Sequence, residues 1–89
     1  MQTYKTVVKQ LLRDTLKTVR KEFNISQELM SEKLKVTPRS YSDLERGVSC
    51  LSATTLLFLF SVMSDERVIA VVKRFIETID ETERNDNAA

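Results

Sequence analysis

Residues 25–47 read ISQELMSEKLKVTPRSYSDLERG and carry the strongest structural signal in the chain. Apolar residues recur at helical spacing in two short segments of it, 27–34 and 38–46. The residues that connect these segments are Lys35, Val36 and Thr37. Two short helices joined so tightly must cross steeply, which predicts a helix-turn-helix over residues 26–46.

Residues typical of helix boundaries bracket both segments. Ser26 and Thr37 are typical N-caps, whose hydroxyl accepts a hydrogen bond from an otherwise unpaired backbone N–H. Pro38 suits the first turn of the second helix, because no backbone N–H is required there. Gly47 suits the end of that helix, where a left-handed residue is favoured. The boundary residues therefore agree with the apolar spacing.

The start signal of a helix occurs four times along the chain: Ser or Thr follows an apolar residue, and a second apolar residue stands four places later. This pattern describes an N-cap with a hydrophobic staple. The four hydroxyl residues are Ser26, Thr37, Ser52 and Ser64. Together with the amphipathic N-terminal stretch, these starts predict an all-α fold of five helices. The expected helices are 3–23, 27–34, 38–46, 53–62 and 65–82, and residues 84–89 are expected to form a disordered tail.

Composition limits the class of protein. The 89 residues suffice for one domain, taken as 1–83, and a single Gly and a single Pro leave little turn chemistry for a β-fold. With no His and only Cys50, we expect neither a disulfide nor a metal site, and no cofactor or small-molecule ligand is indicated. The sequence shows no phosphate-binding Gly loop and no plausible acid pair, which argues against an enzyme. No apolar run resembles a signal peptide or a membrane span, which predicts a cytoplasmic protein.

Charge is distributed unevenly along the chain. Residues 1–47 hold ten Lys and Arg against six Asp and Glu, a net +4, whereas residues 48–89 hold four against seven, a net −3. A basic half suits a polyanionic partner such as DNA, while the acidic half faces solvent or a protein partner. This distribution supports nucleic-acid binding better than the overall charge of +1 does.

Residues 25–47 resemble the lambda repressor and Cro family of helix-turn-helix proteins, also called XRE-like. The family pattern is Ser-Gln-x-x-Leu-Ala, a Leu-Gly-Val turn and an Ile-x-x-Ile-Glu-x-Gly ending. The counterparts in this chain are SQELMS at 26–31, LKV at 34–36 and YSDLERG at 41–47. The resemblance covers about residues 12–63. It implies a lambda-repressor-like DNA-binding domain, here with an extended first helix and a C-terminal helix.

The resemblance also implies roles for individual residues. Gln27 would contact a DNA phosphate and brace the recognition helix, and Arg20 and Glu45 match a structural salt bridge between the first and third helices. Ser31 takes the position of a small residue where two helices approach closely. The positions expected in the core are Leu34, Val36, Tyr41 and Leu44. The positions expected to face the major groove are Thr37, Pro38, Arg39, Ser42 and Asp43, and Arg46 would reach the DNA backbone.

Side-chain chemistry bears on several of these positions. Arg39 could fork onto a guanine, typically worth about 1–3 kcal/mol of discrimination, or could remain a solvated charge. Ser40 and Ser42 are short enough to reach phosphates or base edges. Asp43 could accept a hydrogen bond from a cytosine amine, although a carboxylate near phosphates is repelled by them. Tyr41 is expected in the core rather than as a platform on which bases stack.

Three residues depart from the family pattern. Lys35 stands where the family usually has Gly, in a turn position that is often left-handed. A non-Gly residue there costs on the order of 1 kcal/mol, but Lys35 adds a positive charge close to the DNA. Pro38 removes a donor at a base-facing position, and Asp43 reduces the positive charge toward the groove. These departures bear on the affinity and sequence of the DNA site and leave the fold prediction unchanged.

The C-terminal helix is expected to join two copies of the chain through an apolar strip. The strip residues are Val68, Val72, Phe75, Ile76 and Ile79. Single modules of this kind usually bind DNA as two-fold dimers, and an uncovered strip would favour aggregation. The alternative is that the first, fourth and fifth helices simply cover one another.

The sequence therefore predicts a regulator of transcription that binds double-stranded DNA, as a homodimeric repressor on a palindromic operator, encoded by a bacterium, a phage or another mobile element. Two alternatives stay open. One is an antitoxin that sequesters a toxin and represses its own operon. The other is a protein-interaction or inhibitor module that keeps the fold and binds DNA weakly. Asp43, Pro38 and the near-zero net charge favour the second alternative. The residues that speak against it are Arg39, Arg46, Lys35 and Gln27.

Overall fold

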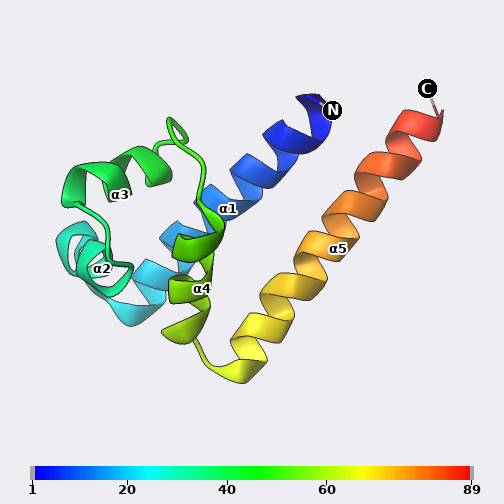
Figure 1. Ribbon diagram of the computed structural model, residues 1–89. Coiled ribbons are helices and arrows are strands. Elements are labelled where there is room, and N and C mark those ends of the chain that lie inside the picture. The colour runs from blue at the N-terminus through cyan, green and yellow to red at the C-terminus, as the bar shows by residue number, and fades with distance from the viewer. Residues whose placement is uncertain (1, 89) are drawn as a thin grey trace.

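The computed structural model describes residues 2–88, with side chains for residues 4–85, and over that range it consists of five α-helices without strands (Figure 1). The helices are α1 (Gln2–Phe23), α2 (Gln27–Lys33), α3 (Pro38–Glu45), α4 (Ala53–Ser61) and α5 (Asp65–Ala88). The all-α, five-helix prediction is confirmed, and α1 to α4 lie close to their expected limits.

The four predicted N-caps are present. In each case the capping hydroxyl accepts a hydrogen bond from the backbone N–H three residues later, at 3.1–3.2 Å. The capped positions are Ser26, Thr37, Ser52 and Ser64. Local side-chain chemistry therefore sets where these helices begin, and each cap contributes about 1 kcal/mol.

The end of α5 differs from the sequence expectation. The helix continues to Ala88 rather than ending near residue 82, so residues 84–88, expected in a disordered tail, are helical. No Gly or Pro interrupts the chain after residue 64, and Thr82 is buried, with its hydroxyl donating to the Thr78 carbonyl at 2.8 Å. Because no Gly or Pro stops the helix and Thr82 is still buried, α5 continues past residue 82 through the polar residues that follow.

The core lies where four helices meet. Its buried residues are Leu16, Val19, Met30, Leu34, Tyr41, Leu44 and Leu59. Leu34, Tyr41 and Leu44 were expected here, and Val36 is half-buried against the same cluster. α1 contacts both α3 and α5, and the two long helices α1 and α5 run in opposite directions (Figure 1). α1 thus connects the α2–α3 pair to the C-terminal helix.

Candidate nucleic-acid interface

The crossing of α2 and α3 depends on a small side chain. Ser31 is fully buried, and its hydroxyl donates to the Glu28 carbonyl one turn earlier at 2.6 Å. A larger side chain at this position would push the two helices apart, because protein interiors are close-packed. Ser31 therefore permits the steep, tight crossing that presents α3.

The turn between α2 and α3 closes with two hydrogen bonds around a left-handed lysine. Lys35 has a φ of 61°, and its N–H donates to the Glu32 carbonyl at 3.2 Å. The N–H of Val36 donates to the Ser31 carbonyl at 3.0 Å. These bonds form a Schellman motif, in which Gly is the favoured left-handed residue. Lys35 takes that conformation at a cost of about 1 kcal/mol and lies exposed beside the start of α3.

Two other helix ends use the same motif. After α3 the left-handed residue is Gly47, with a φ of 78°, as expected. After α1 it is Asn24, with a φ of 56°, where no such turn was expected. Asn tolerates this conformation better than other non-Gly residues, because its short polar side chain can hydrogen-bond locally. Its place just after the last apolar residue of α1 was the available signal.

A buried carboxylate fixes α3 against α1 and α2. Glu45 is only 2% exposed, and Arg20 donates two hydrogen bonds to it, from Nε to Oε2 at 2.6 Å and from Nη2 to Oε1 at 3.2 Å. Gln27 donates from Nε2 to Oε1 at 3.0 Å, and the Tyr41 hydroxyl donates to Oε2. The expected pair of Arg20 and Glu45 is thus present within a larger network. Because its donors come from three helices, the network sets the angle at which α3 is held.

Electrostatics keep this network ionised. Burial alone would raise the pKa of Glu45, but the hydrogen bonds from Arg20, Tyr41 and Gln27 outweigh burial, and the pKa lies below its usual value. The hydrogen bond to Glu45 in turn raises the pKa of Arg20. Burial, together with the bond to Glu45, raises the pKa of Tyr41 far above that of a free tyrosine, so its hydroxyl stays a donor. Tyr41 is therefore a core residue, as expected, rather than a surface for stacked bases, and the bond from its hydroxyl to Glu45 was not predicted.

The outer face of α3 is polar and accessible. Thr37, Pro38, Arg39 and Ser40 are exposed, and Ser42 is half-buried. Among the described residues Arg39 forms no ion pair, so its guanidinium is available to a ligand. The Thr37 hydroxyl donates to the Ser40 hydroxyl at 2.9 Å and accepts from the Ser40 N–H, so these two groups are engaged in capping.

Asp43 is neutralised locally. Its Oδ1 accepts a hydrogen bond from Nη2 of Arg46, the C-cap residue of α3 three positions later. The repulsion of phosphates expected from this carboxylate is therefore reduced by the neighbouring cation. Arg46 itself is largely exposed, with 64% of its side chain accessible, and keeps donors free for a second partner.

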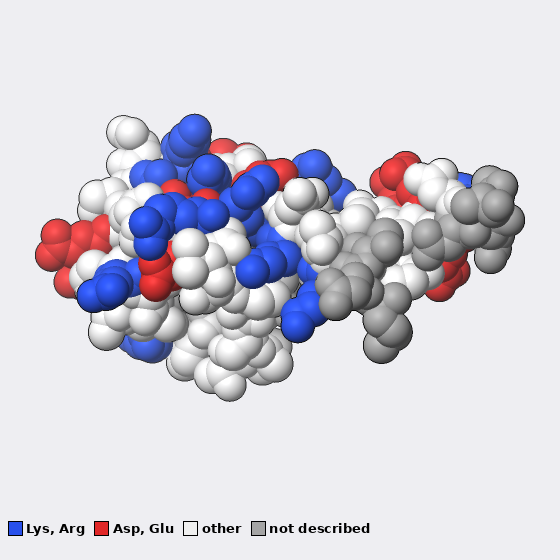
Figure 2. Space-filling model, turned by 90° about the horizontal axis from the view of Figure 1, so that it is seen from above, with Lys and Arg blue, Asp and Glu red and all other residues white. Residues whose placement is uncertain are grey.

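Basic side chains share one face of the molecule. In Figure 2, Lys and Arg gather in a broad band across the part that contains α2, α3 and the middle of α1, with a few acidic groups among them. Acidic side chains lie at the far end, along the C-terminal half of α5. On the face seen in Figure 2, the basic band covers the part of the molecule that contains α3.

The apolar strip expected on α5 divides into two sets. Val68 and Phe75 are half-buried within the chain, whereas Val72, Ile76 and Ile79 are exposed by 40%, 55% and 36%. Ile69, exposed by 54%, extends the outer set. The outer residues follow at spacings of three, four and three, which is the spacing of a coiled-coil seam.

These features define a helix-turn-helix DNA-binding domain: a short α2, a left-handed turn and an α3 held by buried contacts with its polar face outward. A family model described as helix-turn-helix matches residues 16–63, and the chain belongs to this lambda repressor/Cro-type family. The family supports DNA as the partner and a role of the transcription-regulator type. No curated protein and no solved structure matches the chain.

The described residues offer neither a metal site nor a membrane-spanning helix. Within residues 2–88, no group of three His, Cys, Asp or Glu side chains is placed to hold a metal ion. No helix in that range combines the length and the apolar character needed to cross a bilayer.

Proposed function

We propose that the protein is a sequence-specific repressor of transcription that acts in the cytoplasm of a bacterium, as a chromosomal or phage-encoded regulator. α3 enters the major groove of double-stranded DNA, and Arg39 reads a guanine there. Lys35 at one end of α3 and Arg46 at the other reach phosphates on either side of the groove. Repression follows because the bound protein excludes polymerase from the same DNA.

The observation that carries the proposal is the contrast between the two faces of α3. The inner face is fixed by Glu45, whose four hydrogen bonds come from Arg20, Gln27 and Tyr41. The outer face offers the guanidinium of Arg39, which forms no ion pair with any residue that the structure describes. The Glu45 network holds α3 rigidly, and the planar guanidinium of Arg39 can donate two parallel hydrogen bonds to a base. This arrangement suits base reading, because a preorganised side chain loses less entropy on binding.

The experiment is a selection of DNA sites from a randomised duplex library at two salt concentrations. Enrichment of one palindromic sequence that survives at the higher salt supports a dimeric, sequence-specific regulator. Sequence-blind binding that disappears with salt would reflect phosphate contacts alone and contradict the proposal. That second result would favour a protein-interaction or antitoxin-type module built on the same fold.

The homodimer is proposed to form through the outer strip of α5, defined as Ile69, Val72, Ile76 and Ile79. Its coiled-coil spacing suits the same helix of a second copy packing against it about a two-fold axis. Such an axis would match the two halves of a palindrome. An acidic helix end would then lie away from the basic face that meets the DNA.

Ile76→Asp tests the dimer, and Leu57→Asp is its matched control. Leu57 lies on α4 and is exposed by 67%, compared with 55% for Ile76, so both changes place a charge on an accessible apolar position. We expect light scattering to give a dimer mass for the wild type and the Leu57 variant, and a monomer mass for the Ile76 variant. A wild-type monomer at all concentrations, or a dimer that Ile76→Asp leaves intact, would contradict this interface.

A further inference from the structure

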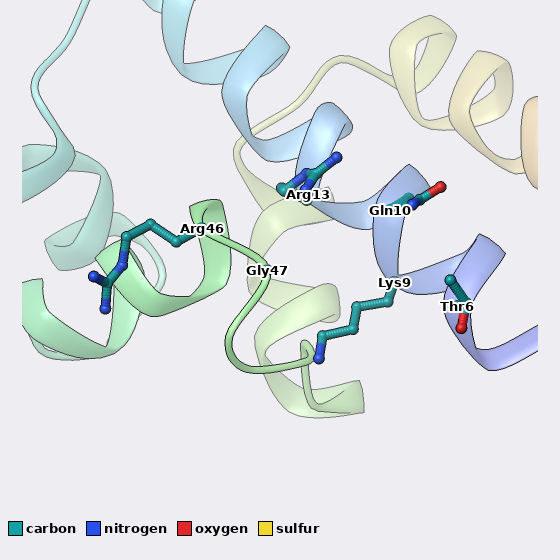
Figure 3. A pocket seen from close by; sticks show the side chains of 6 residues that line it. All are labelled: Thr6, Lys9, Gln10, Arg13, Arg46 and Gly47. Atoms are coloured by element: carbon teal, nitrogen blue, oxygen red, sulfur yellow. The ribbon is translucent and has the colours of Figure 1, made fainter. Parts of the chain in front are cut away.

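An open pocket lies between the N-terminal half of α1 and the turn that follows α3. It has a volume of about 270 Å³, and its lining residues are Thr6, Lys9, Gln10, Arg13, Arg46 and Gly47 (Figure 3). Three of these side chains are cations and none is a carboxylate. An open hollow with this lining suits a small, strongly charged anion.

Arg13 is held in this pocket by packing. A Cβ on Gly47 would lie only 3.4 Å from Nη1 and 3.5 Å from Cδ of Arg13, so the arginine lies directly over the turn. Among the described residues its buried Nε has no hydrogen-bond partner and forms only a long ion pair, at 3.6 Å, with Oδ1 of the exposed Asp14. The guanidinium is therefore placed beside the end of α3 with donors that the described residues do not satisfy.

Lys9 adds a second cation from the same face of α1. It precedes Arg13 by one helical turn, and Figure 3 shows its side chain reaching toward the loop after Gly47. Lys9 forms no ion pair among the described residues. Lys9 and Arg13 thus bring two positive charges from α1 to this turn, and among the described residues only Arg13 has an ion-pair partner, the exposed Asp14. The repulsion between the two cations is relieved when an anion binds. Arg46, at the end of α3, is already paired with Asp43.

We infer, on the basis of the proposed function, that this pocket binds a DNA backbone phosphate next to the segment that α3 contacts. The pocket adjoins the C-terminal end of α3 through Arg46, and the basic band spans α3 and the middle of α1 on one face (Figure 2). Lys9 and Arg13 both precede residue 16, where the match to the helix-turn-helix family begins. The extended α1 therefore adds a phosphate contact to the family's recognition unit, and lengthens the DNA segment that each subunit covers.

The test is the salt dependence of DNA binding by the double variant Lys9→Gln/Arg13→Gln. Affinity is measured from low to high salt on the selected duplex and on a scrambled duplex. We expect the slope of log affinity against log salt to fall in magnitude by about 1 for each subunit, and affinity to fall by the same factor on both duplexes. The control Lys73→Gln removes one positive charge from the exposed part of α5 and should leave the slope unchanged.

Two further variants separate charge from folding. Arg13→Lys keeps the charge, so its slope should stay close to that of the wild type. Lys9→Gln alone leaves the packing of Arg13 over Gly47 intact and should still lower the slope. Thermal unfolding followed by circular dichroism establishes that each variant is folded at the temperature of the binding assay.

The outcomes distinguish this inference from the proposed function. A wild type that selects one sequence, with a double variant whose slope equals that of the Lys73 variant, would overturn the phosphate contact and leave the repressor proposal standing. A wild type that selects no sequence would overturn the repressor proposal itself. Ethylation of single phosphates gives an independent readout: we expect one modified phosphate beside the α3 segment to weaken the wild type but not the double variant. Inorganic phosphate that binds the pocket without any change in the slope on DNA would identify a site for a free anion and overturn the inference.

Discussion

Replacing Glu45 by Gln removes the buried carboxylate on which α1, α2 and α3 converge. The new amide keeps one acceptor oxygen but presents N–H groups where donors from Arg20 and Tyr41 already point. Breaking a buried ion pair on one side typically costs about 3–5 kcal/mol. Because 19% of the Arg20 side chain is exposed, water recovers part of that loss, and we expect about 3 kcal/mol.

Urea unfolding followed by circular dichroism measures this change in the free energy of unfolding. With an m-value of roughly 1–1.5 kcal/mol/M for a chain of this size, the midpoint should fall by about 2–3 M. Glu28→Gln is the matched control, since Glu28 is an exposed acid on α2, and its midpoint should stay near that of the wild type. A loss under about 1 kcal/mol for the Glu45 variant would refute the view that this network positions α3.

The same carboxylate predicts a pH dependence. Because the pKa of Glu45 is lowered on folding from its ordinary value of 4.5, its contribution is complete above that value and is lost as the pH falls through the lower folded pKa. The difference in unfolding free energy between the wild type and Glu45→Gln should therefore stay constant from about pH 5 to pH 8 and narrow at lower pH. If the difference in unfolding free energy between the two proteins narrows near neutral pH, or widens in acid, then a group other than Glu45 determines its pH dependence.

Three other substitutions test the supports of α3 by the same urea assay. Lys35→Gly relieves a left-handed lysine and should stabilise the fold by about 1 kcal/mol, and an unchanged midpoint would show that the turn is not strained. Ser31→Leu overfills the α2–α3 crossing and should cost about 1–3 kcal/mol, whereas full stability would mean that the crossing is loose. Tyr41→Phe removes one hydrogen bond to the Glu45 carboxylate and should lower the free energy of unfolding by about 2 kcal/mol. An unchanged free energy of unfolding would show that this hydroxyl does not contribute to the network.

Local signals in the sequence predicted most of the fold. The hydroxyls of Ser26 and Thr37 were expected to cap α2 and α3, and they do so. Gly47 was expected to end α3 in a left-handed conformation, which is also present. A single hydroxyl or a missing side chain dictates such features within one turn of the chain, so they can be read locally.

Features that depend on distant partners were harder to predict. Pairing of Arg20 with Glu45 followed from the family resemblance, which also gave Gln27 the role of bracing the recognition helix, but the partner of Gln27, the same carboxylate, was not predicted. The ion pair between Asp43 and Arg46 was also missed, although it is local, and the i,i+3 spacing of the two residues was the available signal. Arg13 was overlooked because its position depends on the turn at Gly47, far along the chain. The spacing of Lys9 and Arg13 by one helical turn was the signal available for that pocket.

The most direct test of base reading by α3 is the affinity of the wild type and Arg39→Ala for the selected duplex and for its single-base variants, at one salt concentration. We expect Arg39→Ala to cost about 1–3 kcal/mol on the selected site and to lose discrimination at one guanine while keeping it elsewhere. An equal loss of affinity on every duplex would show that Arg39 contacts only a phosphate and does not read a base. No loss on any sequence would contradict the claim that α3 reads DNA through this residue.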